Sequence, residues 1–234
     1  MWILLAALLA ATAAPASQQA ASIGVSPLKI DQPGDDRTAV ITLSNHGGQT
    51  ATLQVRLFRW SQIDGDEVFD RTDDIVASPP VSIVEPGQRS IARVVRLASS
   101  PPAAEESYRL LIDELPSPNR HGGTVQFAVR HSIPIFFQAA VASQPKLGWR
   151  IDADHGAPRL QITNTGGRYA RLSRVILSDV NGEIWRHEGL FGYVLAGATM
   201  SWSLPDALGQ PLTSPKLTVE TDHGSMTIPL MGED

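Results

Sequence analysis

The histidines and the acidic runs are the residues of this chain whose types could bind metals or transfer protons. The six histidines are scattered without the spacing of metal ligands, and no G-x-S-x-G, Walker or H-E-x-x-H motif occurs. The runs DGDE at 64–67 and DRTDD at 70–74 lack the spacing, the central Gly and the terminal Glu of an EF-hand loop. Because nothing supplies a nucleophile with its base, the sequence predicts no enzyme, no metal site and no cofactor.

Aromatic residues offer a second kind of chemistry, the stacking of sugars on exposed rings. Trp60, Trp149, Trp185 and Trp202 lie among residues typical of strands, which favours core or rim packing over sugar stacking. His131 interrupts an apolar alternation and is interpreted as a partly exposed strand histidine. A secreted two-domain carbohydrate-binding adhesin, binding through exposed Trp residues, stays open as an alternative.

Composition narrows the class of protein further. The net charge of -5 and the pI near 5.7 give no basic surface, which argues against nucleic-acid binding. The chain has no cysteine, so thiol, zinc-thiolate and iron–sulfur chemistry are excluded and packing must stabilise the fold without disulfides. A length of 234 residues suffices for two domains of ordinary size.

The first 20 residues are rich in Ala and Leu and are followed by small residues that suit signal cleavage. We interpret residues 1–20 as a signal peptide, which predicts export of the protein. No Lys or Arg precedes the apolar stretch, so an uncleaved N-terminal anchor is the alternative. No later segment approaches about 20 consecutive apolar residues.

Short strand-like runs recur along the rest of the chain, separated by Gly, Pro, Asn and Asp. This spacing predicts an all-β protein built of antiparallel sandwiches. The small residues and Pro of AAVASQPKLGW resemble a linker, which places one domain at 21–139 and another at 142–234. LSNHGGQTATLQV and ITNTGGRYARLSRV, one from each domain, share a strand, an Asn-containing Gly-Gly turn and a second strand.

The stretch TVQFAVRHSIPIFF, residues 124–137, is longer than a typical strand. Apolar residues occupy one parity, broken by His131, while Gln126, Arg130 and Pro134 lie on the other. This alternation predicts a half-buried β-strand. The question it raises is what covers so long an apolar edge.

The first domain resembles the periplasmic chaperones of the chaperone–usher pathway. The resemblance rests on SPLKIDQPG, ITLSNHGGQTATLQVRLFRW, ASPPVSIVEPGQRSIARVVR, EESYRLLIDELP and TVQFAVRHSIPIFF, which occur in the order and spacing of that family. YRLLIDELP and SIPIFF are similar to the archaic class, and the second domain matches more weakly through ITNTGGRYARL and ETDHG. The resemblance implies two immunoglobulin-like sandwiches set at an angle, in an L or boomerang shape.

The resemblance also implies a function. Such chaperones bind and stabilise pilus or fimbrial subunits that lack their final strand, by donating a strand of their own, and deliver them to an outer-membrane usher without ATP. Donation of this kind is β-augmentation, in which main-chain bonds give affinity and alternate side chains fill the partner's core. The donated residues implied for this chain are Val125, Phe127, Val129 and Ile133.

Two further sites follow from the resemblance. Family members hold the subunit's terminal carboxylate with two basic residues; Lys29 matches the first, but the second falls on Pro134, and Arg130 lies too far upstream to replace it in the same register. Two interpretations stay open: Lys29 acts with another partner, or the subunit is aligned differently and held mainly by hydrophobic pockets. An interdomain charge cluster is implied at Arg93, Glu105 and Asp222, with the adjoining Glu106 as the alternative to Glu105.

Overall fold

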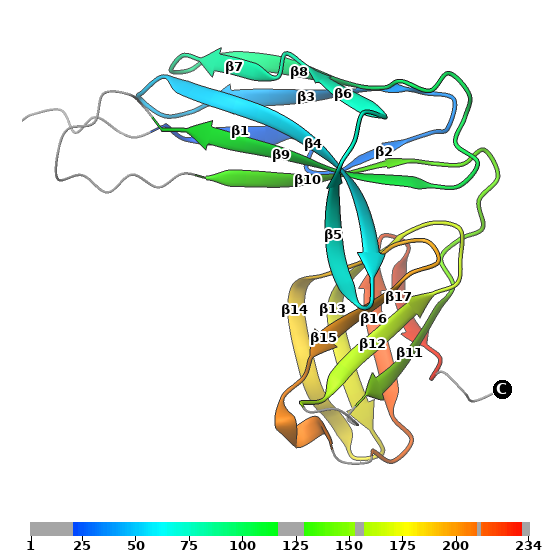
Figure 1. Cartoon of the computed structure of the whole chain (residues 1–234). Helices are drawn as coiled ribbons and strands as arrows, with labels where there is room; N and C mark the ends of the chain where they lie inside the picture. Colours follow the sequence, from blue (N-terminus) through cyan, green and yellow to red (C-terminus); the bar gives the residue numbers. More distant parts are fainter. Residues whose placement is uncertain (1–20, 117–128, 153–156, 210–211, 231–234) are drawn as a thin grey trace, which may run out of the picture.

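The computed structural model describes residues 21–116, 129–152, 157–209 and 212–230, and these form two β-sandwiches that give the molecule an L shape (Figure 1). The predicted all-β fold of two sandwiches is confirmed. The only helical element among these residues is the short 3-10 helix η1 (Asp206–Gly209). No helix in the described segments is both long enough and apolar enough to cross a membrane.

The first sandwich consists of two sheets. One sheet has the order β1-β3-β8-β6, and the other has the order β2-β10-β9-β4-β5, with β7 paired to β4. Their bounds are β1 (Ile23–Ser26), β2 (Ile30–Gln32), β3 (Thr38–Asn45), β4 (Ala51–Ile63), β5 (Asp66–Arg71), β6 (Ile75–Ser78), β7 (Val81–Val84), β8 (Arg89–Arg96), β9 (Glu106–Leu115) and β10 (Arg130–Phe137). All pairings in these sheets are antiparallel except that of β2 with β10.

Alternation of apolar residues explains why these segments pack as a sandwich. On β3, Ala39, Ile41 and Leu43 are buried while their neighbours face outward. On β9, Leu110 and Ile112 do the same from the opposite sheet, and both belong to one continuous apolar core. The other face of β9 is therefore free to carry polar side chains.

The second sandwich also has two sheets, with strand orders β11-β12-β15 and β14-β13-β16-β17. Their bounds are β11 (Leu147–Asp152), β12 (Arg159–Asn164), β13 (Ala170–Asp179), β14 (Gly182–Val194), β15 (Thr199–Ser203), β16 (Lys216–Thr221) and β17 (Gly224–Ile228). A separate apolar core surrounds the fully buried Trp149.

The Asn residues of the two similar Gly-Gly turns are bonded alike. Asn45 is 1% exposed, and its side-chain amide donates to the carbonyls of Gln49 and Val84. Its side-chain oxygen, Oδ1, accepts the N–H of Gly47. Asn164 is fully buried and makes the corresponding bonds in the second domain. Each Asn thus ties a turn to a neighbouring strand, which gives the sequence likeness a structural basis.

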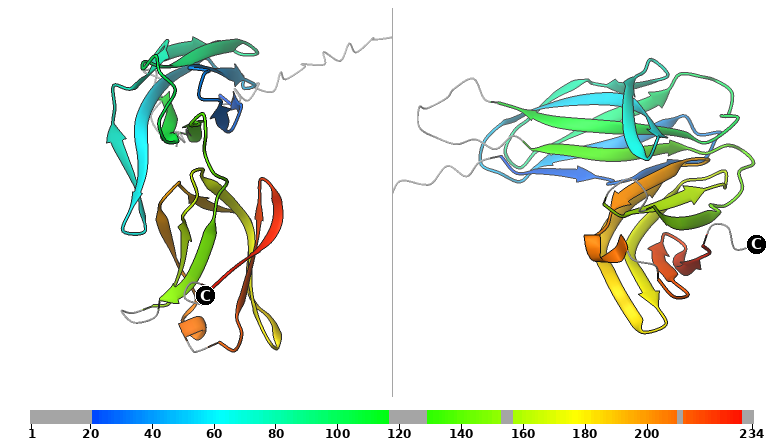
Figure 2. Two further views of the ribbon diagram at one scale, coloured as in Figure 1. Left: turned by 90° about the vertical axis from the view of Figure 1, so that its right-hand side faces the viewer. Right: turned by 60° about the horizontal axis from the view of Figure 1, so that its bottom comes forward.

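The domains contact each other through more than the linker. Figure 2 shows the two sandwiches and the β4–β5 hairpin that projects from the first toward the second. The β4–β5 hairpin extends onto the second domain, where the Gln62 amide donates to the carbonyl of Tyr193 and accepts the N–H of Leu195, both at 2.8 Å. At the hairpin tip the carbonyl of Gly65 accepts the N–H of Ser201 on β15. An isolated β-bridge, between Gly65 and Met200, thus joins the two domains at this point.

An aromatic cluster fills the corner between the domains. Trp60 and Phe136 come from the first domain, and Tyr169 and Tyr193 come from the second. Phe136 and Tyr169 are stacked with ring centroids 3.6 Å apart, and Trp60 meets Tyr193 edge-on at 5.5 Å. Contacts of this kind contribute about 0.5–1.5 kcal/mol beyond area burial.

Candidate functional site

Strand β10 has one edge that is only partly covered. It pairs with β9 over its whole length, from Arg130 to Phe137, whereas β2 covers only Ile135–Phe137 on the other side. Residues 130–134 therefore have no paired strand on that side among the described residues. Such an edge presents free backbone donors and acceptors to a further strand.

Alternate apolar side chains of β10 face the core of the first domain. Ile133 and Ile135 are 2% and 0% exposed and belong to the core of the first domain, so the predicted assignment of Ile133 to the donated residues is wrong. Its side chain already fills the chain's own sandwich. Val129 immediately precedes β10 and is 48% exposed, while Val125 and Phe127 lie outside the described residues.

Two cationic residues flank Pro134 on the other face of the sheet. Pro134 lies opposite Arg109 on β9. On its other side, β2 begins at Ile30, which pairs with Ile135, so Lys29 and Pro134 are the residues that directly precede the first paired position on each strand. Directly paired residues share a face, so Arg109 lies on the face of Pro134, where the family resemblance expects a basic residue, and Lys29 lies at the start of β2 on the opposite side of β10.

Arg109 is buried beneath the β4–β5 hairpin with only part of its hydrogen-bonding capacity used. Its guanidinium lies 3.7 Å from the ring of Trp60 and donates to Glu67 at 3.1 Å, but its Nε has no partner among the described residues. Burial lowers the pKa of Arg109, although Glu67 partly offsets this effect. An additional carboxylate beside the guanidinium would offset the free-energy cost of burying its charge.

Sequence reasoning missed Arg109. The signal available was a charged residue in the otherwise apolar run YRLLIDELP, but its cross-strand position became visible only with the register of β9 against β10.

Lys29 lies at the junction of the domains in a cluster of polar groups. Its Nζ lies 2.5 Å from Asp222, 3.1 Å from Asp31 and 2.9 Å from the hydroxyl of Tyr169. Burial acts to lower the pKa of Lys29, but the hydrogen bonds to Asp222, Tyr169 and Asp31 together raise it above its ordinary value. Arg171 approaches the other oxygen of Asp222 at 3.4 Å.

This cluster lines a cavity of about 520 Å³ between the domains, bordered by Lys29, Asp31, Arg168, Arg171, Asp222 and His223. The cavity therefore combines cations of both domains with two carboxylates. No group of three or more His, Asp or Glu side chains suited to holding a metal ion occurs in the described segments.

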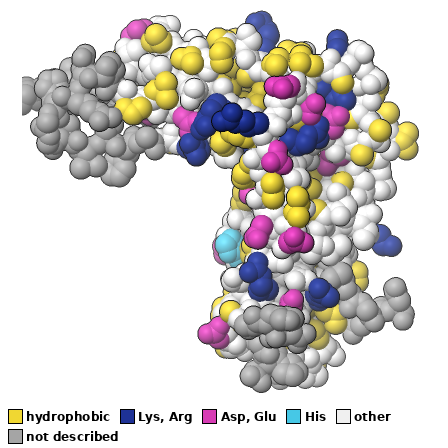
Figure 3. All heavy atoms as spheres, viewed as in Figure 1, with side chains coloured by type: hydrophobic (Ala, Val, Ile, Leu, Met, Phe, Trp, Pro, Cys, Tyr) yellow, Lys and Arg dark blue, Asp and Glu magenta, His cyan; other side chains and the backbone are white. Residues whose placement is uncertain are grey.

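Arg130 lies away from this cavity. It pairs with Asp113, directly opposite on β9, and Asp113 also pairs with Arg56. Figure 3 shows basic side chains beside acidic ones on this part of the first domain. Arg130 is thus engaged at the far end of β10, four residues from Pro134.

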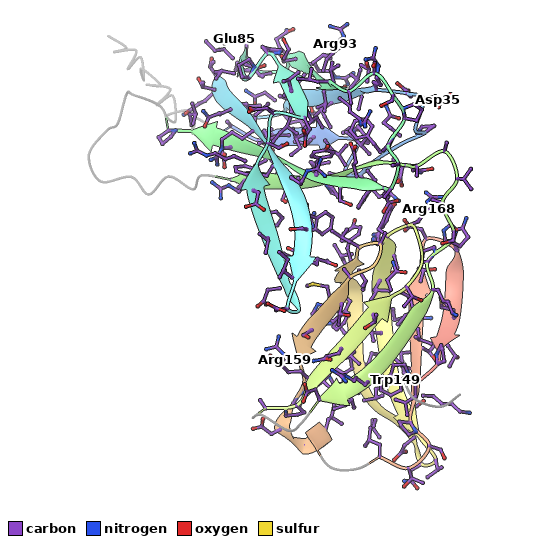
Figure 4. The ribbon with its side chains drawn as sticks, turned by 45° about the vertical axis from the view of Figure 1, so that its right-hand side comes forward. Asp35, Glu85, Arg93, Trp149, Arg159 and Arg168 are labelled. Carbon is purple, nitrogen blue, oxygen red and sulfur yellow. The ribbon has the colours of Figure 1, made fainter. Side chains whose placement is uncertain are left out.

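The structure does not bring the predicted interdomain cluster of Arg93, Glu105 and Asp222 together around one arginine: Glu105 lies near Arg168, whereas Asp222 pairs with Lys29 and Arg171. Glu105 and Asp222 both contact residues of the other domain, but Arg93 is exposed on β8 and lies on the far side of the first domain from Arg168 (Figure 4). The inward-facing arginine of that strand is Arg96, which shares the parity of the buried Ala92 and Val94. The assignment of Arg93 is therefore wrong.

Glu105 is a carboxylate enclosed at the domain junction. Its side chain is fully buried, one oxygen accepts the N–H of Tyr169 at 2.7 Å, and the other lies 3.9 Å from Arg168. The second oxygen has no hydrogen-bond partner among the described residues. Burial raises the pKa of Glu105 to about 7, against the opposing effects of Tyr169 and Arg168.

We expect Glu105 to make the folded protein less stable as the pH rises. Because its pKa is raised on folding, the protonated form is favoured in the folded state, and stability falls as the pH rises from about 4.5 through about 7. Glu105→Gln removes this titration. Urea unfolding at pH 5 and pH 8 should show the free energy of unfolding of the variant gaining on wild type by more than about 1 kcal/mol at the higher pH. An unchanged difference between the two pH values would contradict the assignment.

Two of the four tryptophans considered for sugar stacking are inaccessible. Trp60 and Trp149 are 2% and 1% exposed. Trp185 and Trp202 are half-buried and pack against the core of the second domain, where Phe191 contacts both rings. These positions fit the predicted core and rim packing.

Comparisons with known proteins agree with this architecture. The model of the pili and flagellar-assembly chaperone family, PapD N-terminal domain, matches residues 22–141. Chaperone protein PapD of Escherichia coli is 24% identical over 121 residues, which are 50% of this chain and 49% of PapD. The match thus spans about half the length of that curated relative.

Solved structures extend the likeness to the whole molecule. A chain of the CsuC–CsuE chaperone-tip adhesion subunit pre-assembly complex, from archaic chaperone-usher Csu pili of Acinetobacter baumannii, has a TM-score of 0.73 and 26% identity. That match covers 90% of this chain and 99% of the other. A structure of the Salmonella enterica SafA pilin with the SafB chaperone has a TM-score of 0.61 at 18% identity over 89% and 96% of the chains, which shows a shared fold. The chain therefore belongs to the family of pilus and flagellar-assembly chaperones with a PapD-type N-terminal domain.

Proposed function

We propose that this protein is a periplasmic chaperone that binds pilus subunits by donor-strand complementation and delivers them to an outer-membrane usher. The observation that carries the proposal is the uncovered edge of β10, which a strand of a subunit can extend by main-chain hydrogen bonds. Membership of the chaperone family supports it, as does the similarity to a chain of a chaperone-tip adhesion subunit complex. The proposed role needs no catalysis and no ATP.

The apolar alternation before β10 supplies the side chains for the subunit's groove. Val125, Phe127 and Val129 continue the parity of Ile133 and Ile135, which close the first domain's own core. A subunit that lacks its final strand leaves a matching apolar groove, so the same alternation serves two cores in succession.

Lys29 and Arg109 are proposed to hold the subunit's terminal carboxylate. They flank Pro134, which has neither a charge nor an N–H to offer. A carboxylate bound between an ammonium and a guanidinium forms charge-assisted hydrogen bonds with both. Fixing the end of the subunit in this way would set the register in which its last strand pairs with β10.

The donated residues are tested by replacing them on both parities. Phe127→Asp or Val129→Asp places a charge in the apolar groove and should lower recovery of a co-expressed cognate subunit by at least about tenfold. Gln126→Asp, on the other parity, introduces the same charge and should leave most of the recovery intact. Affinity purification of the tagged chaperone measures the co-purified subunit. Equal losses at Phe127 and Gln126 would rule out donation in this register.

The same purification separates the proposal from the adhesin alternative. A chaperone is recovered one-to-one with an otherwise unstable β-protein, whereas an adhesin is recovered alone and is retained on a glycan column. The burial of Trp60 and Trp149 favours the first outcome.

A further inference from the structure

We infer that Asp222 is an internal carboxylate that occupies the Lys29 anchor in the free chaperone, so that an incoming carboxylate must displace it toward Arg171. The inference rests on the proposed function, since it concerns what holds the same anchor before a subunit arrives. Asp222 would then compete with an incoming carboxylate for Lys29 and so lower the affinity with which that carboxylate binds.

The ammonium of Lys29 already has as many partners as it has donors. An ammonium has three N–H groups, and three oxygen atoms, from Asp222, Asp31 and Tyr169, lie within 3.1 Å of Nζ. Two of these partners carry a negative charge. A further carboxylate would therefore lack a free donor and would meet two like charges, unless one of the present partners moves away.

Asp222 is the partner best placed to leave. Asp31 is only two residues from Lys29 in the first domain and also accepts the Tyr169 hydroxyl at 2.6 Å. Asp222 belongs to the turn between β16 and β17 of the second domain, and its other oxygen already lies 3.4 Å from Arg171. Moving from Lys29 to Arg171 keeps the carboxylate paired, so the exchange avoids an uncompensated charge.

The exchange also involves the domain junction. Lys29 belongs to the first domain, whereas Asp222 and Arg171 both belong to the second. Displacing Asp222 replaces an ion pair between domains by one within a domain. Occupation of the anchor would thus weaken one of the contacts that join the two sandwiches.

The test uses the small number of lysines in the chain. Lys29, Lys146 and Lys216 are its three lysines, so the side-chain signals of lysine-labelled protein can be assigned by NMR. Acetate is the probe, acetamide is the uncharged control, and the shift of the Lys29 signal gives the dissociation constant. Asp222→Asn should lower that constant for acetate about threefold to fivefold, the effect of removing a partly exposed ion pair, and leave acetamide unchanged.

Two variants keep the test decisive. Glu220→Gln removes the same charge from β16, at a residue paired with Arg174, and should behave as wild type. Arg171→Gln leaves Asp222 without its second cation and should weaken acetate binding, which tests the exchange even if Asp222→Asn folds poorly. Equal acetate binding in wild type, Asp222→Asn and Arg171→Gln would overturn the inference, and so would a Lys29 signal that never responds to acetate. Subunit capture by the wild-type protein is measured separately and tests the proposed function alone.

Discussion

Replacing Arg109 with Ala will lower recovery of a co-expressed cognate subunit by about tenfold or more, while the chaperone itself stays folded. The size follows from losing the proposed charge-assisted hydrogen bond to the subunit's terminal carboxylate, since such a bond is worth about 1.5 to 3 kcal/mol. The Nε of Arg109 has no hydrogen-bond partner among the described residues, so this donor is unused in the free protein, although it is buried. The partner left behind, Glu67, is 37% exposed and can be rehydrated.

The measurement is the amount of subunit that co-purifies with the tagged chaperone, alongside a circular dichroism spectrum of each variant. Lys29→Ala should cause a loss of similar size, since the two cations are proposed to share one carboxylate. Arg130→Ala is the matched control, because Arg130 pairs with Asp113 at the other end of β10. Full recovery with Arg109→Ala, or a greater loss with Arg130→Ala, would rule out Arg109 as an anchor.

The second large effect concerns stability. Arg96→Met should lower the free energy of unfolding by about 3 to 5 kcal/mol, the usual cost of removing one partner of a buried ion pair. The Arg96 side chain is 5% exposed, contacts both oxygens of Glu106 at 2.7 and 2.8 Å, and also donates to the carbonyls of Ala98 and Ser100. Its removal leaves all of these acceptors without that donor.

Arg93→Met provides the comparison on the same strand. Arg93 is exposed, so this substitution should change the free energy of unfolding by less than about 0.5 kcal/mol. Urea denaturation of the two variants and the wild type gives both values. A larger loss with Arg93→Met than with Arg96→Met would reverse the assignment of the two faces of β8.

The errors made from sequence share a physical cause, which is that alternation defines two faces without saying which face is inside. On β8 one parity holds Ile91 and Val95 and the other holds Ala92 and Val94, so both look apolar and the buried arginine could not be distinguished. On β3 the contrast is clearer, because Thr38, Thr42 and Ser44 make the exposed parity mostly polar and Ala39, Ile41 and Leu43 make the buried one apolar.

A second limit appears where a strand changes its role along its length. The apolar parity runs without interruption from Val125 to Ile135, except at His131, and nothing in it marks where the first domain's core begins. Ile133 was therefore grouped with Val129, although the two differ completely in exposure. Arg109 escaped notice for a related reason, because its proximity to Pro134 depends on the register between two strands.

The β4–β5 hairpin has a mechanical consequence for the corner of the L. A single linker, residues 138–146, would act as a hinge, and a second attachment would still leave one axis of rotation. Three contacts attach the domains to each other away from the linker. They are the backbone hydrogen bond between Gly65 and Ser201, the two hydrogen bonds of the Gln62 side chain to the second domain, and the stacking of Phe136 on Tyr169. These contacts lie on several sides of the corner, so rotation about the linker would have to break backbone, side-chain and aromatic contacts together.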